Sequence, residues 1–238
     1  MTTYFKAIRP DGTSFHDPSF AWATEPGGVT THRRPAGAAT TWNPSMMNAA
    51  DYLSVSTVPT DCTGMRWPCR LLEVEPLGDV FTPDAKDLPN KRAALAFRTV
   101  RELPAHEALG PNGEHLVALI ERCSHLTADD ANRLAATWDA ARDATWAAAR
   151  AAARDAARDA AWAAAWAATW DATRAAPWDA TRDAARDAAW AAAWAATWAL
   201  AVRDLIGDTF TQDHYDALAM PWRTVVGPLH PDDAAVAR

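Results

Sequence analysis

Thiol and imidazole groups are the first side chains in this sequence that could perform chemistry. Cys62 and Cys69 lie close together, and His16 and His32 precede them. A structural zinc site needs four ligands, and its paired cysteines commonly stand about two to four residues apart. The longer spacing between Cys62 and Cys69 does not fit that pattern. We therefore expect no metal and no cofactor, and we expect free thiols that are wholly or partly buried.

A second set of polar side chains lies on the predicted strands of the N-terminal half. Arg9 ends a first strand, the run Ser-Val-Ser-Thr stands at 54–57 on a middle strand, and Glu-Val-Glu stands at 73–75 on a later one. This order resembles the Arg, Ser-Thr-Ser and Glu-x-Glu signature of the ADP-ribosyltransferases. The resemblance implies an NAD site organised by Arg and Ser, with the last Glu positioning the acceptor. The catalytic residues of this alternative are Arg9, Ser54, Ser56, Glu73 and Glu75.

The same residues also have a purely structural interpretation. Ser alternating with Val, and Glu alternating with Val, is typical of a strand with one solvated face. The sequence offers no Ser-His-Asp or Cys-His arrangement and no glycine-rich phosphate loop. We therefore expect a non-enzymatic structural or interaction protein, and we keep the ADP-ribosyltransferase-like enzyme as the alternative.

A tetrapeptide repeat dominates the second half of the chain. From 138 to 198 every fourth residue is Trp or Arg, and nearly all residues between them are Ala, Asp or Thr. Ala is the best helix former, and Pro177 is the only breaker in the repeat. Thr127 can cap the helix, and Asp129 and Asp130 place negative charge at its N-terminus. The pattern predicts one very long helix over 128–206, about 120 Å if unbroken, which is kinked or folded back at Pro177.

The tryptophans of this repeat are the predicted interaction residues. Trp side chains along an exposed helix would form an apolar surface that favours association, so we expect them to be buried against another helix. That helix belongs either to the same chain or to a partner, which predicts self-association or binding to another helical protein. The predicted interaction residues are Trp138, Trp146, Trp162, Trp166, Trp170, Trp178, Trp190, Trp194 and Trp198.

Composition narrows the class of protein. The 238 residues carry a formal net charge of −7, which argues against general nucleic-acid binding. Arg and Asp interrupt the repeat throughout, so no segment has the apolar length of a membrane span. The N-terminus has no apolar signal core, and the three cysteines do not form a dense disulfide pattern, so we expect a cytoplasmic protein.

The residues before the repeat predict a small mixed domain. Strands are expected near Thr3–Ile8, Val29–His32, Tyr52–Val58 and Arg70–Glu75, with a helix over Glu114–His125. A short helix over Gln212–Ala219, ended by Met-Pro-Trp at 220–222, follows the repeat. The predicted fold is α+β, with a head over 1–126, a helical arm over 127–207 and a C-terminal docking segment over 208–238.

Three stretches resemble an uncharacterised family. The segment YFKAIRPDGTSF, the segment that begins YLSVSTVPTDC and the segment that begins DLPNKRAALAF resemble a domain of actinobacterial and phage-related hypothetical proteins. The repeat followed by LAVRDLIGDTFTQDHYDALAMPWRTVVGP resembles the C-terminal part of many actinobacterial hypothetical proteins. The resemblance implies a bacterial or mobile-element origin, and it carries no catalytic residues to transfer.

Overall fold

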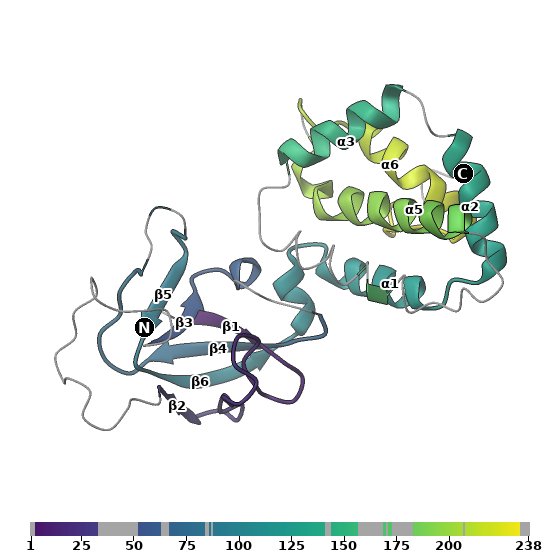
Figure 1. The fold of residues 1–238 in the computed structure, drawn as a ribbon. Coiled ribbons are helices and arrows are strands. Elements are labelled where there is room, and N and C mark those ends of the chain that lie inside the picture. The colour runs from purple at the N-terminus through teal and green to yellow at the C-terminus, as the bar shows by residue number, and fades with distance from the viewer. Residues whose placement is uncertain are drawn as a thin grey trace. The chain divides into compact units, whose positions relative to one another are not determined.

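A computed structural model of the chain shows two compact units, Met1–Ala108 and Leu109–Arg238 (Figure 1). The structure describes residues 3–32, 52–62, 67–83, 86, 88–140, 144–156, 169, 171–172, 183–206 and 208–233. The first unit is built from strands and the second from helices, so the α+β class expected from the sequence is confirmed. The division falls after Ala108, whereas the sequence placed the end of the head at 126.

The first unit is an antiparallel half-barrel. Its strand order is β2-β6-β4-β1-β3-β5, with β1 at the centre between β4 and β3 (Figure 1). The strands are β1 (Tyr4–Ile8), β2 (Val29–Thr31), β3 (Leu53–Ser56), β4 (Arg70–Pro76), β5 (Lys91–Ala94) and β6 (Ala96–Leu103). Four of these strands match the predicted ones within three residues. The strands β5 and β6 lie outside the ranges for which the sequence predicted strands.

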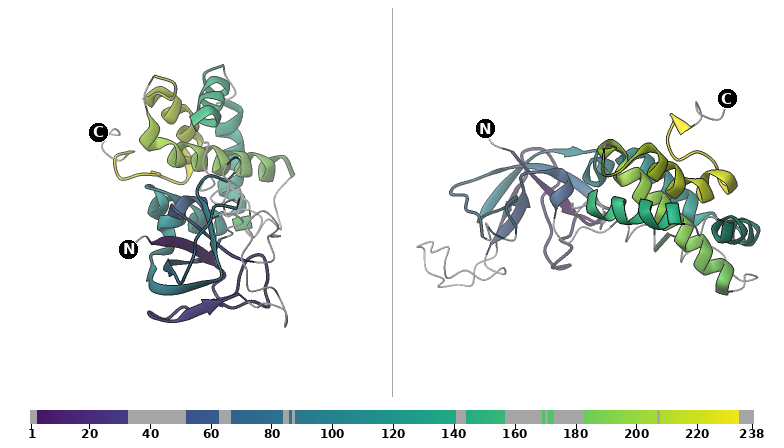
Figure 2. Two further views of the ribbon diagram at one scale, coloured as in Figure 1. Left: turned by 90° about the vertical axis from the view of Figure 1, so that its left-hand side faces the viewer. Right: turned by 90° about the horizontal axis from the view of Figure 1, so that it is seen from above.

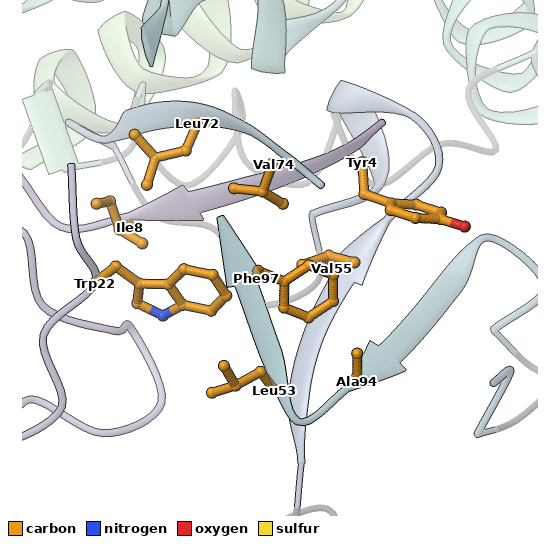
Figure 3. Packing of buried hydrophobic residues seen from close by; sticks show 9 residues of the cluster. All are labelled: Tyr4, Ile8, Trp22, Leu53, Val55, Leu72, Val74, Ala94 and Phe97. Atoms are coloured by element: carbon orange, nitrogen blue, oxygen red, sulfur yellow. The ribbon is translucent and has the colours of Figure 1, made fainter. Parts of the chain in front are cut away.

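One face of this sheet carries the core of the first unit. Alternate residues of each strand point to the same face, so Tyr4 and Ile8 of β1 share a side with Leu72 and Val74 of β4. Figure 3 shows these side chains packed with an indole from the loop that precedes β2. The complete cluster is Tyr4, Ile8, Trp22, Leu53, Val55, Leu72, Val74, Ala94 and Phe97.

The second unit is a helical bundle. Its helices are α1 (Gly113–Ser124), α2 (Ala128–Ala140), α3 (Ala144–Ala156), α5 (Asp183–Ala201) and α6 (Gln212–Val225). The central helix is α5, because α1, α2, α3 and α6 all pack against it (Figures 1 and 2). A helix that is surrounded in this way must be apolar on every side. All residues from 192 to 200 are accordingly buried, and they are Ala, Trp, Thr and Leu.

The prediction of one very long helix is wrong. The longest helix among the described residues is α5, with 19 residues, and α2 ends at Ala140 before α3 begins at Ala144. The reason is the burial of the Ala and Trp side chains. An extended helix would expose the apolar run that ends at Leu200 to water, whereas folding the chain back on itself surrounds that run with other helices. Pro177, where a kink or hairpin was expected, lies outside the described residues.

The predicted helix start is confirmed, and two predicted helix ends are wrong. The backbone N–H of Asp130 donates to the Thr127 hydroxyl at 3.2 Å, and the Asp130 carboxylate accepts from the Thr127 N–H at 3.0 Å. This reciprocal pair caps α2. The central helix ends at Ala201, before Arg203, and α6 continues through Pro221 to Val225. Pro221 therefore lies inside α6, next to the buried Trp222.

Candidate functional site

The candidate residues of the ADP-ribosyltransferase-like alternative do not meet in one place. β1 separates β3, which carries Ser54 and Ser56, from β4, which carries Glu73 and Glu75. The register pairs Tyr4 with Val74 and Ile8 with Arg70, so Glu75 lies beside the start of β1 and Arg9 follows its end. At about 3.3 Å per residue these two side chains are roughly 20 Å apart along the sheet.

The two glutamates form cross-strand ion pairs with β6. Arg101 Nε donates to Glu73 at 2.5 Å, and Arg98 Nη1 donates to Glu75 at 2.6 Å. The hydrogen bond from Arg101 lowers the pKa of Glu73 below its ordinary value. The Glu73 carboxylate is thus held ionised, and both ion pairs lie on the face of the sheet opposite the core. These ion pairs agree with the structural interpretation of the Glu-Val-Glu pattern, which is a strand with one solvated face.

The tryptophans of the repeat that the structure describes lie within the bundle. Trp194 and Trp198 of α5 are buried, and the rings of Trp190, Trp194 and Trp198 follow one another at centroid distances of 6.2 and 5.8 Å. The guanidinium of Arg150, from α3, lies 4.0 Å from the ring centre of Trp194. Trp138 is half-buried in α2. The side chain of Trp146 and the residues Trp162, Trp166, Trp170 and Trp178 lie outside the described residues.

The cysteines are buried free thiols, as the sequence predicted. Burial raises the pKa of Cys62 to about 11 and that of Cys69 to about 12, so both thiols stay protonated at neutral pH. His16 is exposed in a loop, and His32 directly follows β2. Within the described part of the chain, no group of three His, Cys, Asp or Glu side chains is placed to hold a metal ion.

A buried lysine occupies the core side of the half-barrel. Lys6 alternates with Tyr4 and Ile8 on β1, and its Nζ donates to the backbone carbonyl of Ser54 at 3.0 Å. The same Nζ lies 5.1 Å from the ring centre of Trp22. A small cavity adjoins it, and among the lining residues are Ser56, Cys62 and Lys91.

The burial of Lys6 changes its protonation. Removal from water disfavours the charged ammonium and lowers the pKa of Lys6 from 10.5 to about 8. The nearby Lys91 acts in the same direction, whereas Cys62 opposes it. At pH 7 such an amine is still mostly protonated, but its neutral fraction, about one molecule in ten, is far larger than that of an ordinary lysine.

A larger concavity lies at the end of β1. It has a volume of about 400 Å³ and is lined by Arg9, Pro10, Asp11, Phe15 and Trp67. Phe15 and Trp67 are half-buried. The Asp11 carboxylate accepts from the N–H of Thr13 at 2.9 Å and from its hydroxyl at 2.7 Å, which fixes the turn after Arg9.

A polar clasp closes the C-terminal end of the helical unit. The buried Asp233 carboxylate accepts from the Tyr215 hydroxyl at 3.0 Å and from the backbone N–H groups of Leu229 and His230 at 2.9 and 3.0 Å. Arg223 lies 3.5 Å from the same carboxylate. Burial is the largest cause that raises the pKa of Tyr215, which remains a neutral donor. These contacts attach the segment after α6 to that helix.

We expect Asp233→Asn to destabilise the chain by roughly 2–3 kcal/mol, because it replaces a buried charged acceptor of several hydrogen bonds. The matched control is Asp232→Asn, which removes an exposed ion pair with Arg203 and should change stability by less than about 1 kcal/mol. Urea denaturation followed by circular dichroism measures both. Equal effects of the two substitutions would contradict the role of the clasp.

Comparison with known proteins identifies no family for this chain. No family model, no curated protein and no solved structure matches the chain. The resemblance to actinobacterial and phage-related hypothetical proteins stays a prediction. No helix within the described residues has the length and apolar character needed to cross a membrane.

Sequence reasoning missed three features, the buried Lys6, the aromatic concavity at Trp67 and the clasp at Asp233. A signal existed only for the lysine, since it stands in phase with Tyr4 and Ile8 on a strand whose alternate residues are buried. The concavity joins Trp67 to residues 9–15, which lie far from it in the sequence, so its assembly leaves no local pattern. The clasp joins residues of the short segment 215–233, and its identity depends on which of their polar side chains the fold buries.

Proposed function

We propose that this chain is a non-enzymatic interaction protein that contacts its partner through the concavity of Arg9, Phe15 and Trp67. The observation that carries the proposal is the composition of this concavity, in which the half-buried Phe15 and Trp67 line the same surface as Arg9 and Asp11. Trp and Arg are enriched among the residues that dominate the binding energy of protein interfaces. The volume of about 400 Å³ suits one or two inserted side chains.

The chemistry of the lining defines the partner. The rings of Phe15 and Trp67 favour a flat apolar group, which gains from stacking and from the release of water. Arg9 presents a planar fork of donors that matches a carboxylate. The partner of this proposal is therefore a protein segment that carries an aromatic side chain next to an acidic one.

The helical unit has a supporting role in this proposal. The contacts of Trp194 and Trp198 are made by helices of the same chain, so the packing of these residues needs no second molecule. Self-association through the remaining tryptophans of the repeat stays a prediction, and sedimentation of the full chain tests it.

The binding proposal is tested with a small probe of the same chemistry. Indole-3-acetate carries an aromatic ring and a carboxylate, and tryptamine carries the same ring with a positive charge. We expect indole-3-acetate to shift the indole N–H signal of Trp67 in an NMR spectrum of the full chain, with a millimolar dissociation constant. The Trp67→Phe variant assigns that signal.

Variants separate the ring contact from the charge contact. Arg9→Met should weaken the binding of indole-3-acetate by about fivefold to tenfold, which is the effect expected from one charge-assisted hydrogen bond. Arg98→Met is the matched control, because Arg98 pairs with Glu75 on the sheet and does not line the concavity. Equal binding of tryptamine, or shifts confined to other indoles, would exclude the proposed site.

A further inference from the structure

We propose that the segment 227–233 is a pH-sensitive latch, which stays closed while His115 and His230 are neutral and opens when both imidazoles are protonated. This inference is independent of the binding role proposed for Arg9 and Trp67, because it concerns the helical unit alone. Opening the latch uncovers Leu229, whose side chain is 3% exposed in the closed form.

The latch has a pivot and contacts that fasten it. Gly227, directly after α6, has a φ of +116°, a conformation that L side chains rarely adopt. Beyond this pivot, the carbonyl of Pro228 accepts from the guanidinium of Arg122, on α1, at 2.8 Å. The backbone N–H of Leu229 donates to the Asp233 carboxylate at 2.9 Å. The segment can therefore turn at one residue once these contacts are released.

Two imidazoles meet where the latch lies beside α1. The ring centres of His115, from α1, and His230 are 4.4 Å apart, and the rings meet edge to face at an interplanar angle of 72°. His230 Nδ1 accepts the backbone N–H of Asp232 at 3.2 Å, so the neutral ring carries its proton on Nε2. Protonation of His230 removes this acceptor, and protonation of His115 as well places two like charges in contact.

An arginine adds to the positive charge at this point. Arg203 belongs to the short helix η5 (Arg203–Leu205), and its Nη2 donates to the Asp232 carboxylate at 2.6 Å. The same carboxylate lies 3.4 Å from His230 Nδ1. Asp232 is thus shared between a permanent cation and the imidazole. A protonated His230 therefore has Arg203 as a like charge on the side opposite in sign to its carboxylate.

The second carboxylate of the latch also has a partner already. Asp233 accepts from the Tyr215 hydroxyl at 3.0 Å, and Arg223 Nη1 lies 3.5 Å from it. Arg223 in turn binds Asp216 of the same helix at 2.9 Å. Both carboxylates of the latch therefore have an arginine partner before His230 gains a proton.

The direction of the pH response follows from these surroundings. Partial burial is the largest cause that lowers the pKa of His230, and Arg203 and His115 act in the same direction, whereas the two aspartates oppose them. In the open latch these contacts are lost, and the pKa returns toward its ordinary value of about 6.5. The open form thus binds the proton more readily than the closed form. The latch is most stable above about pH 6.5 and loosens as the pH falls below it.

The test follows amide hydrogen exchange in the full chain by NMR, from about pH 7.5 to 5.5, the range in which histidines titrate. The Leu229 N–H reports opening directly, because its acceptor is the Asp233 carboxylate. We expect its protection, corrected for the intrinsic exchange rate, to fall at least about fivefold. Two unit charges about 4 Å apart in water disfavour their contact by that factor. Amides of the central helix α5 report unfolding of the whole unit and should keep their protection.

Three variants complete the experiment. His115→Gln and His230→Gln each remove one of the two charges, so the protection of Leu229 should become nearly constant over this pH range. His125→Gln is the matched control, because His125 is exposed at the C-terminal cap of the same helix as His115, and it should keep the full response.

The native chain alone can overturn the proposal. Protection of Leu229 that does not depend on pH would show that the latch does not respond to the histidines. An equal loss of protection in α5 would show acid unfolding of the unit in place of a local opening. An unchanged response in His115→Gln would overturn the proposal as well, because the contact between the two imidazoles carries it.

Discussion

Replacing Trp198 by Ala should destabilise the helical unit by about 3–5 kcal/mol, the usual cost of removing a large aromatic side chain from a core. Trp198 is 3% exposed on the central helix, with its ring against that of Trp194. Ala preserves helix propensity, so the loss measures packing alone. Guanidinium denaturation followed by far-ultraviolet circular dichroism gives the change in the free energy of unfolding.

The matched control is Trp190→Ala in the same helix. Trp190 is only partly buried, so its removal leaves a smaller cavity and should cost roughly half as much. Similar small effects at both positions would mean that Trp198 lies on a solvated face. That outcome would contradict the central position of α5 in the bundle.

Replacing Lys6 by Met should make the chain more stable at pH 7, by up to about 2 kcal/mol. The lowered pKa of Lys6 means that the folded state holds its ammonium at a cost of roughly 3 kcal/mol at neutral pH. Met fills a similar volume without a charge, and the lost hydrogen bond to Ser54 offsets about 1 kcal/mol of the gain. Thermal and urea denaturation at pH 7 measure the difference.

The pH dependence of stability has a defined sign. Between pH 8 and 10.5 the unfolded chain binds the Lys6 proton more often than the folded chain, so the free energy of unfolding rises with pH. The contribution of Lys6 is about 1 kcal/mol from pH 7 to 9, and it should vanish in Lys6→Met. The raised pKa of Cys62 acts in the opposite direction above pH 9. Repeating the comparison in a Cys62→Ala background removes that contribution, and a difference independent of pH would refute the assignment.

The first unit was largely predictable because its strands have local signals. Leu72 and Val74 alternate with Glu73 and Glu75, and this period of two identifies a strand with one buried face. The order of the strands was not predictable, because β1 pairs with β3 and β4, and such pairings depend on contacts between distant residues. The assembly of the concavity at Trp67 depends on the same contacts.

The second unit was predicted correctly in type and incorrectly in extent. Ala-rich composition and the cap at Thr127 identify helices from local energies. Helix propensity and capping favour one long helix and several short helices alike. The choice depends on the burial of Trp194 and Trp198, which is a property of the folded chain. A uniform repeat carries little local information about where its helices end.

The position of α5 has a consequence for synthesis on the ribosome. The chain makes α1, α2 and α3 first, and each of these packs on a helix that is translated later. Synthesis proceeds at about 5–20 residues per second, so several seconds pass between the appearance of the early helices and the exit of residues 183–201 from the tunnel. The half-barrel precedes them and contains all of its own strands by Leu103. Nascent chains truncated before and after the central helix should therefore differ sharply in protease resistance of the helical unit, while the half-barrel is already protected in both.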